Sequence, residues 1–558
     1  MTGTEVVIYI FLVIIIIASV QIISKTVKTK NLKKDIVNSW GKLPHEKYDK
    51  DSIESISSYF LNLMESKNLK MHIDDTTWND LNMDNVFKKI NNTRSTVGEE
   101  YLYAALRLPV NSKSILLQRG KIIDFFQNNP DERNKLLFCF ASLGKRRNLN
   151  ITDYLFFSGK KHGKSVLLYR ILSSLAIISV AVAYIKPEVG LAALPIMFGI
   201  NAVIYYREKS KIGHMLESVN YITEFLHCAK KVLKLDIRGI NEYNNTLKVS
   251  LKPLIGITKK SAKFLNYTGD ILVEYVKIFL LKELIDFQSI LDSINKNRND
   301  FIRIYETLGA IDSLLAIASY RCFLQFYTIP DLNNNKNIQL NTEEIYHPLL
   351  NEPIANSIKT EKPVLLTGSN ASGKSTFLKT IAINAIFAQT IYTCLAQRYV
   401  SNFCMVFTSM ALKDDILSNE SYYIAEIKSL KRILDNLNQE IPCFIFIDEV
   451  LRGTNTVERI SASSEILFYL SKKNCLCFAA THDIELASIL AHYYKSYHFQ
   501  ENIKGDEIYF DYKLYPEKST TRNAIKLLKL MGYSQDIVEQ AELKANEFLS
   551  LGKWNKMG

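Results

Sequence analysis

The chain has 558 residues, 47 % hydrophobic and 11 % aromatic, so it can bury a large core and is not intrinsically disordered. Its formal net charge of +12 favours a nucleic-acid or an anionic membrane partner. Eight cysteines are scattered without zinc-site spacing. We interpret them as core thiols in a reducing compartment and expect no structural metal.

The first predicted element is an apolar run, Val6–Ile23, whose length of about 18 residues is just enough to span ~30 Å of hydrocarbon. Its N-terminal flank has no Lys or Arg, and no small-residue cleavage site follows, so a cleaved signal is disfavoured. Basic residues follow instead, from Lys25 to Lys34. This order predicts a transmembrane anchor over residues 1–24, with the rest of the chain on the cytoplasmic side of the inner membrane.

A second apolar block runs from Ile171 to Tyr206 and is divided by Lys186-Pro187-Glu188. Basic residues flank both ends, which predicts a transmembrane hairpin over residues 166–208, with both ends cytoplasmic. The alternative is a helical hairpin buried in a soluble core. The flanks of the apolar segments together hold twelve Lys or Arg residues, as many as the net charge, so the basicity does not require nucleic acid.

The regions on either side of the hairpin, residues 25–165 and 209–345, are predicted to form an all-α core. A polar stretch, Asp331–Asn337, is interpreted as a linker. It leads into an α/β domain over residues 346–558, in which apolar strands alternate with helices and the last helices are expected to contribute dimer contacts.

The most informative motif is Gly368-Ser369-Asn370-Ala371-Ser372-Gly373-Lys374-Ser375, which fills the phosphate-loop pattern G-x-x-x-x-G-K-[ST]. It lies between a predicted strand, residues 363–367, and an apolar helix that begins near Lys374 and runs from Thr376 to about Thr390. Such a loop points backbone N–H groups at phosphate oxygens, and the helix adds its positive N-terminal end. Lys374 is expected to reach the β- and γ-phosphates of ATP, and the Ser375 hydroxyl to bind Mg²⁺. A chance match in a Gly/Ser loop is the alternative.

Two further strands are predicted to end in reactive side chains. The apolar run of residues 443–447 ends in Asp448 and Glu449, a carboxylate pair that can hold Mg²⁺ and deprotonate an attacking water. The run of residues 475–480 precedes His482. Ligands bind at the carboxyl edge of parallel sheets, so His482 is a candidate for sensing the γ-phosphate. An acidic turn and a structural histidine are the alternatives.

These pieces in this order resemble the MutS family of ATPases. The resemblance covers residues 365–378, the Asp-Glu-x-x-Arg-Gly-Thr-x-Thr run of residues 448–456, and residues 480–482. It implies that Asn370 contacts the nucleotide, Glu449 positions water and His482 reads the γ-phosphate. It also implies a homodimer in which Ser421 reaches the partner's nucleotide. The chain departs from the family in Ala371-Ser372 and in Leu451, which stands where the family has a Gly or small residue.

Weaker resemblance extends to residues 80–100 and 309–318, which look like the entry and return helices of the family's core. No mismatch-reading wedge domain is found. The predicted fold is therefore a C-terminal α/β P-loop ATPase domain of the ABC/MutS kind, after an all-α core interrupted by transmembrane helices. Two functions follow as hypotheses. One is a membrane-anchored ATPase that binds DNA in mismatch repair or recombination, and the other is an ATP-gated switch acting on a protein or lipid partner.

Overall fold

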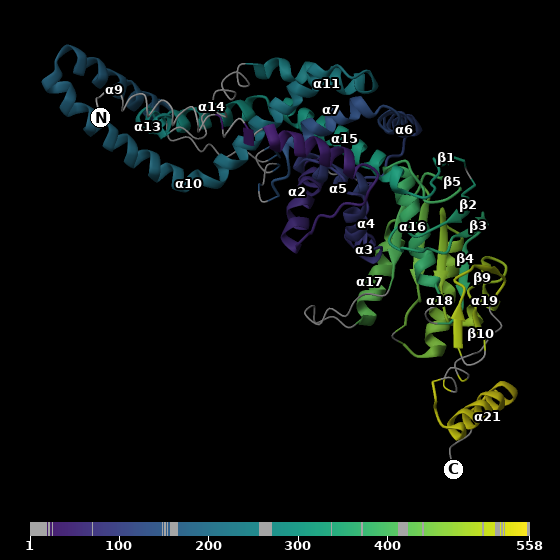
Figure 1. Ribbon diagram of the computed structural model, residues 1–558. Helices are drawn as coiled ribbons and strands as arrows, with labels where there is room; N and C mark the ends of the chain where they lie inside the picture. The colour runs from purple at the N-terminus through teal and green to yellow at the C-terminus, as the bar shows by residue number, and fades with distance from the viewer. Residues whose placement is uncertain are drawn as a thin grey trace. The chain divides into compact units, whose positions relative to one another are not determined.

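A computed structural model describes most of the chain. Its description leaves out residues 1–18, 20–22, 25, 68, 70, 148, 150–151, 153–154, 157–165, 256–270, 336, 370–371, 411–421, 438–439, 453, 505–506, 519–524, 526–527, 529–530 and 555–558, and the side chains of residues 212, 214–216, 271–273, 422, 502–504, 507–508 and 549. The chain divides into two compact units (Figure 1). The first contains residues 1–70, 88–105 and 118–323, and the second contains residues 71–87, 106–117 and 324–558.

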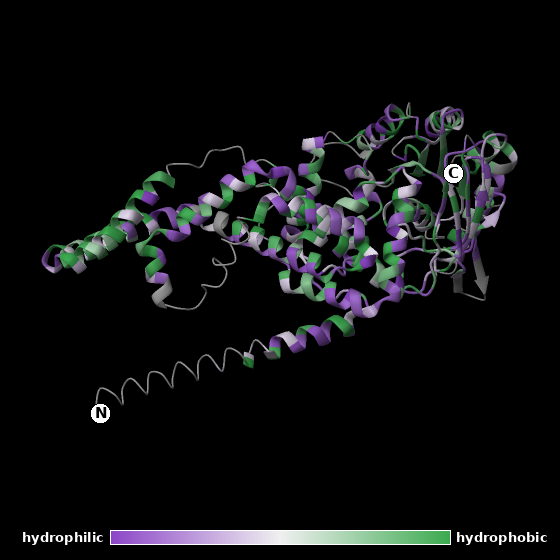
Figure 2. Ribbon diagram, turned by 90° about the horizontal axis from the view of Figure 1, so that it is seen from above, coloured by the Kyte–Doolittle hydropathy of each residue, from purple (hydrophilic) through white to green (hydrophobic). Residues whose placement is uncertain are grey.

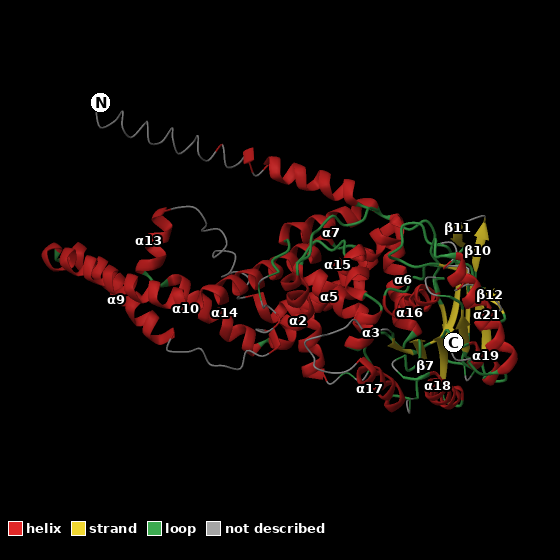
Figure 3. Cartoon of the chain, turned by 90° about the horizontal axis from the view of Figure 1, so that it is seen from below, coloured by secondary structure: helices red, strands yellow, loops and turns green. Residues whose placement is uncertain are grey.

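The first unit is helical in its described part, as Figure 3 shows. Two short 3-10 helices, Arg238–Ile240 and Lys252–Leu254, flank α11. The α-helices that lie wholly or largely in this unit are α2 (Lys50–Lys67), α5 (Thr96–Arg107), α6 (Lys113–Asn128), α7 (Pro130–Leu143), α9 (Val166–Ile185), α10 (Pro187–Leu235), α11 (Asn241–Leu251), α13 (Ile271–Phe279), α14 (Lys282–Lys296) and α15 (Arg298–Phe323).

Helix α15 forms the centre of this unit and is buried almost continuously from Phe301 to Arg321. Its Asp312 carboxylate accepts hydrogen bonds from the backbone N–H of Ser95 at 2.9 Å and from the Ser95 hydroxyl at 2.6 Å, next to the start of α5. A Cβ at Gly309 would lie 2.6 Å from the Cβ of Tyr101, so glycine permits the close approach of α5 and α15. The two N-terminal segments that resemble the family core therefore pack against each other.

The predicted hairpin is present as two antiparallel helices, α9 and α10, that meet at Lys186. Val166–Ile185 and the Pro187–Lys211 part of α10 are long and apolar enough to cross a membrane, by length and composition. Only 11 % and 17 % of their most apolar windows are buried, and Figure 2 shows this pair largely in the hydrophobic colour. Helix α10 does not stop near residue 208 but continues to Leu235. The predicted anchor, Val6–Ile23, lies almost entirely outside the described residues.

The second unit carries the strands. Its α-helices are α3 (Asp75–Asp80), α4 (Met83–Ile90, shared with the first unit), α16 (Lys374–Thr390), α17 (Tyr422–Asp435), α18 (Thr456–Ser471), α19 (Ile484–Ile489) and α21 (Gln535–Leu551). Its strands are β1 (Asp331–Asn333), β2 (Leu340–Ile345), β3 (Asn356–Thr360), β4 (Val364–Thr367), β5 (Arg398–Asn402), β6 (Met405–Ser409), β7 (Cys443–Asp448), β8 (Cys475–Ala480), β9 (Lys495–His498), β10 (Glu501–Lys504), β11 (Glu507–Phe510) and β12 (Tyr515–Pro516).

The main sheet has six strands in the order β12-β9-β4-β8-β7-β6, all parallel except β12. Side chains alternate between its two faces. Ile445 and Cys477 face the cluster formed with α17, α18 and α19, whereas the rings of Phe446 and Phe478 stack at 5.3 Å on the other face. The buried helix α16 contacts β6, β7 and β8. Helices therefore cover both faces of the predicted strands, which explains their continuous apolar sequences.

A second sheet, ordered β1-β5-β2-β3, corrects one expectation. Residues Asp331–Asn337 were expected to be a linker, but Asp331–Asn333 form β1 and pair in parallel with β5. Leu332 is the buried residue of this strand, and its polar neighbours make the strand hard to recognise in the sequence. Strand β11 ends at Phe510, because Tyr512 adopts a φ of 53° that a strand cannot contain.

Helix α3 covers the edge strand β6, although the two are far apart in sequence. The Asp80 carboxylate accepts the Thr408 hydroxyl at 2.6 Å and the backbone N–H of Met410 at 3.0 Å. The Thr77 hydroxyl accepts the backbone N–H of Thr408 at 3.3 Å. An exposed edge strand invites pairing with other chains, so these contacts close one edge of the main sheet.

Candidate nucleotide site

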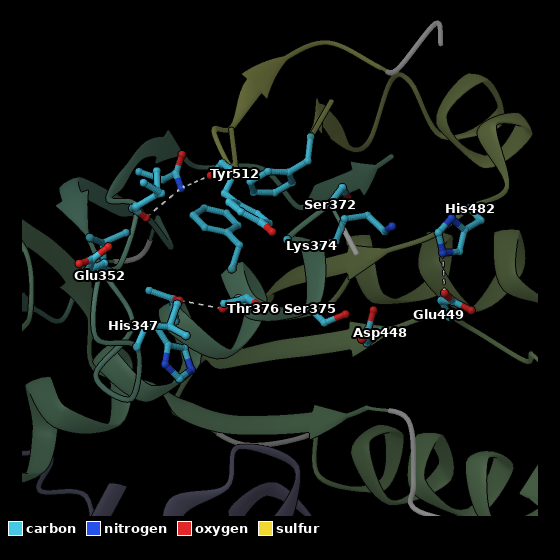
Figure 4. A pocket seen from close by; sticks show the side chains of 18 of the residues that line it. His347, Glu352, Ser372, Lys374, Ser375, Thr376, Asp448, Glu449, His482 and Tyr512 are labelled. Carbon is cyan, nitrogen blue, oxygen red and sulfur yellow. Dashed lines mark hydrogen bonds and ion pairs between the residues drawn. The ribbon is translucent and has the colours of Figure 1, made fainter. Parts of the chain in front are cut away.

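A cavity of about 520 Å³ lies beyond the carboxyl ends of β4, β7 and β8. This edge of a parallel sheet is where ligands bind in α/β proteins. Figure 4 shows its lining. The sequence-predicted residues among the lining are Ser372, Gly373, Lys374, Ser375, Thr376, Asp448, Glu449 and His482. Segments more than 100 residues apart in sequence are thus brought to one site.

The loop after β4 is held in shape by two glycines. Gly368 has φ +140°, and a Cβ there would lie 2.5 Å from the carbonyl oxygen of Phe499. Gly373 has φ +109° and directly precedes α16. Residues with side chains rarely adopt either conformation. The chain therefore turns tightly at the two ends of the loop, and Ser372 and Gly373 line the cavity. Ser369 does not line the cavity, and its hydroxyl donates a hydrogen bond to the Glu501 carboxylate.

Lys374 is buried at the first position of α16. Its Nζ donates to the carbonyl oxygens of Gly368 at 2.8 Å and Ser369 at 2.7 Å. Burial lowers the pKa of Lys374 to about 8, although the carboxylates of Asp448 and Glu449 oppose that shift. The ammonium group is thus folded back over its own loop, next to the space that a phosphate would occupy.

Glu449 follows β7 in a left-handed conformation, with φ 60°. Its carboxylate accepts from His482 Nε2 at 2.8 Å and from Arg452 Nη2 at 2.8 Å. Burial alone would raise its pKa, but these hydrogen bonds outweigh burial and lower the pKa of Glu449 to about 2. The backbone N–H of Glu449 donates to Ala480 O at 3.0 Å, which joins the ends of β7 and β8. The carboxylate is therefore ionised and fixed at the rim of the cavity.

The turn after Glu449 is stabilised from α17. Glu426 accepts the backbone N–H of Leu451 and, at 3.1 Å, that of Arg452. Leu451 has φ 58°, a left-handed conformation in which Gly is favoured. This explains why the family has a Gly or small residue there. The cost of a left-handed residue, roughly 1–2 kcal/mol, is matched by burying a leucine side chain, about 1.5–3 kcal/mol. Leu451 is 5 % exposed.

The rest of the Arg-Gly-Thr-x-Thr run starts a helix. The Asn455 side chain accepts the backbone N–H of Glu458 at 3.0 Å and caps α18. Arg459, one turn into the helix, donates to both carboxylate oxygens of Asp483 at 2.7 and 2.8 Å. Since Asp483 follows His482 directly, this pair fixes the segment that carries the histidine. Sequence reasoning did not identify Glu426, Arg459 or Asp483 as part of the site.

The other end of the cavity combines apolar side chains with His347, Glu352 and Asn356, and it was also not predicted. Its lining includes Leu350, Ile354, Phe499 and Tyr512, and Figure 4 shows Tyr512 facing this end. The backbone carbonyl of Tyr512 accepts from Asn356 Nδ2 at 3.0 Å. The aromatic residues come from the segment around β10 and β11, where single Phe and Tyr residues form no motif. In the sequence, their position after β9 was the signal that could have indicated that they belong to the site.

Three of the predicted site residues, Asn370, Ala371 and Ser421, lie outside the described residues. Ser375 and Asp448 lie next to each other in Figure 4, and their hydroxyl and carboxylate oxygens are ligands that suit Mg²⁺. Ser372 Oγ is buried at the cavity and has no hydrogen-bond partner among the described residues, as expected of a group that awaits a ligand.

Comparison with known families gives a match to MutS domain V over residues 364–549, the segment that holds the phosphate loop, Asp448, Glu449 and His482. The C-terminal part of the chain is therefore related to the MutS family. Proteins similar to this chain include human MutS protein homolog 4, 31 % identical over 275 residues, which are 47 % of this chain and 27 % of the relative. The DNA mismatch repair protein MutS of Thermotoga maritima is 26 % identical, over 48 % of this chain and 35 % of the relative.

The DNA mismatch repair protein MSH3 of Candida albicans is also 26 % identical, over 51 % of this chain and 30 % of the relative. The matched region of the chain thus spans about a quarter to a third of these relatives. The family assignment made from the sequence motifs is confirmed, and it rests on the C-terminal half of the chain.

Proposed function

We propose that the protein is a membrane-anchored MutS-type ATPase that works as a homodimer and couples ATP binding and hydrolysis to a change in the dimer. The observation that carries this proposal is the cavity, where a glycine-rich loop, a lysine, two carboxylates and a histidine line one end and aromatic residues the other. A triphosphate suits the first end, and a nucleotide base suits the second because flat apolar rings favour aromatic faces.

Each residue then has a role. Loop N–H groups and Lys374 bind the phosphates, and Tyr512 offers a face to the base. Ser375 and Asp448 would hold Mg²⁺, which neutralises phosphate charge when bound. Glu449 positions and deprotonates the attacking water, and His482 lies beside it at the γ-phosphate end. Arg452 restrains Glu449, so the Glu449 carboxylate has to break its ion pair with Arg452 before it can accept a proton.

The membrane part of the proposal is supported by the exposed apolar hairpin α9–α10 and by the basic flanks. The hairpin would place both of its ends, and with them the ATPase domain, in the cytoplasm. The client is a separate matter. The relatives named as DNA mismatch repair proteins support DNA, whereas the anchor supports a switch that acts on a protein or lipid partner.

Two variants test the ATPase assignment in the full-length protein. Lys374→Ala should abolish ATP binding because the phosphate-facing cation is lost. Glu449→Gln should keep ATP binding and slow hydrolysis by roughly 10²–10⁴-fold because only the base is lost. Lys362→Ala, an exposed lysine just before β4, is the matched control and should behave like wild type. Equal hydrolysis by wild type and Glu449→Gln would remove the proposal.

A further inference from the structure

Helix α13 is apolar on most of its surface. From Ile271 to Leu281 the only charged residues are Glu274 and Lys277, which lie one turn apart on the same side. Ile278 and Leu281 are buried against Tyr205 of α10 and its neighbours. Tyr275 and Val276, in contrast, are each 55 % exposed. The helix therefore has an apolar face that packs on the hairpin and a second apolar face, with Val276 and the exposed part of Tyr275, that is uncovered in the described part of the chain.

Helix α13 docks on the apolar part of α10. The Phe198 ring lies 6.1 Å from the Tyr275 ring and 6.3 Å from the Phe279 ring, between centroids. The fully buried Asn201 donates from Nδ2 to the carbonyl oxygen of Phe279 at 2.5 Å. This carbonyl is at the end of α13, where the chain reverses at Leu281 with φ 48°, so it has no partner within the helix.

A buried asparagine that satisfies a single backbone carbonyl is expected in a lipid environment. At a water-exposed helix end, solvent would satisfy the Phe279 carbonyl. In hydrocarbon each unsatisfied backbone group costs several kcal/mol, so a side chain has to replace water. Asn201 performs this role on an otherwise apolar stretch of α10.

Positions along α10 give the depth. At ~1.5 Å per residue from Pro187, Asn201 lies roughly 21 Å and Lys209 roughly 33 Å from the hairpin tip. The hydrocarbon core is ~30 Å thick, so α13 contacts α10 inside that thickness. A polar cluster then marks the boundary of the hydrocarbon core on the side of the hairpin's two ends. Lys209 Nζ donates to the Tyr205 hydroxyl at 2.7 Å and lies 3.6 Å from the Glu283 carboxylate, as Tyr and Lys do at membrane surfaces.

We propose that α13 is a third membrane-embedded element, lying beside the hairpin in the leaflet nearest the hairpin's two ends. Tyr275 and Val276 face the acyl chains, and Glu274 and Lys277 face the headgroups. The occupant of the uncovered face is thus lipid. This inference rests on the membrane anchoring in the proposed function, and the test separates the two.

The test places a tryptophan on α13. Full-length Tyr275→Trp is reconstituted in vesicles of phosphatidylcholine with a minor share of phosphatidylglycerol, with acyl chains either plain or brominated, and wild type supplies the baseline from its three native tryptophans. Bromine quenches tryptophan on contact, so the added emission should be lost in brominated vesicles. Adding Asn201→Leu should weaken that quenching, because α13 loses its attachment to α10.

Two control positions make the outcome decisive. Val180→Trp, exposed on α9, should be quenched, and Val249→Trp, exposed on α11, should not. Quenching at residue 180 without quenching at residue 275 would overturn the role of α13 and leave the anchor in place. Quenching at neither residue 180 nor residue 275 would overturn both the membrane anchoring of the hairpin and the role of α13. Retained ATP hydrolysis in each variant shows that the protein has folded.

Discussion

At the scale of single residues, the charges of the site hold one another in a resting arrangement. Lys374 hydrogen-bonds to its own loop, and Glu449 is held between Arg452 and His482. Both catalytic candidates therefore have to exchange partners when nucleotide enters. Sequence motifs identified these residues by type and order, but the pairing of Glu449 with His482 depends on the ends of β7 and β8 lying side by side.

The pKa of Lys374 leads to a pH-dependent affinity. Burial lowers this pKa to about 8, and bound phosphates favour the charged form. Above pH 8 the free protein has lost this proton and must regain it on binding. Nucleotide affinity should therefore hold up to about pH 8 and then fall, by up to about tenfold per pH unit. Titration of a fluorescent ATP analogue between pH 7 and 9.5 measures it.

Lys374→Arg is the matched control, because arginine keeps its charge throughout this range. Its affinity should be weaker at neutral pH but independent of pH. A fall in both proteins would assign the pH dependence to another group.

At the scale of elements, the sequence predicted best those strands and helices that are uniformly buried. Strands β4, β7 and β8 and helix α16 are buried on both sides, so their apolar runs are unbroken and their ends were placed within a residue or two. Strand β1 was missed because only Leu332 is buried among polar neighbours. The aromatic residues of the cavity were missed because Phe499 and Tyr512, which flank the antiparallel pair β10–β11, become neighbours only when these strands pair.

The edge contact between α3 and β6 predicts a local loss of stability. Asp80→Ala removes the acceptor of the Met410 N–H and the Thr408 hydroxyl, and a buried unsatisfied donor costs about 1–3 kcal/mol. Hydrogen exchange of the β6 amides should accelerate accordingly. Asp80→Asn keeps a carbonyl acceptor and should change exchange less.

An exposed carboxylate on the same unit provides the control. Asp435 pairs with Lys431 on the surface of α17, and Asp435→Ala should leave β6 exchange near wild type. Unchanged exchange in Asp80→Ala would show that α3 does not protect this strand.

At the scale of the whole molecule, the proposed dimer makes a mixing experiment informative. If Ser421 reaches the partner's nucleotide, Lys374→Ala and Ser421→Ala homodimers are both inactive, because every site lacks one part. In a mixed dimer, the defective loop and the defective Ser421 belong to the same site, and the other site is complete. Partial ATP hydrolysis should therefore return on mixing. Mixed dimers that form but stay inactive would place each site within one chain.

DNA binding by the whole chain should be electrostatic. A mismatch sensor kinks the duplex by inserting an apolar wedge, and no such wedge domain is recognisable in the sequence. Affinity for duplex DNA should therefore fall steeply with salt and should not distinguish matched from mismatched duplexes. The measurement uses the full-length protein in detergent at several salt concentrations. A strong mismatch preference would reveal a reading element, and no binding at low salt would favour the protein or lipid client.

The attachment of α3 to β6 also has a consequence for the order of events during synthesis. Thr77 and Thr408 are 331 residues apart in sequence. At ~5–20 residues per second, α3 waits roughly 17 to 66 s on the ribosome before β6 emerges. The whole hairpin α9–α10 is made in that interval, before the strand-bearing unit can close. A chain terminated before residue 408 would carry α3 with its partner strand missing.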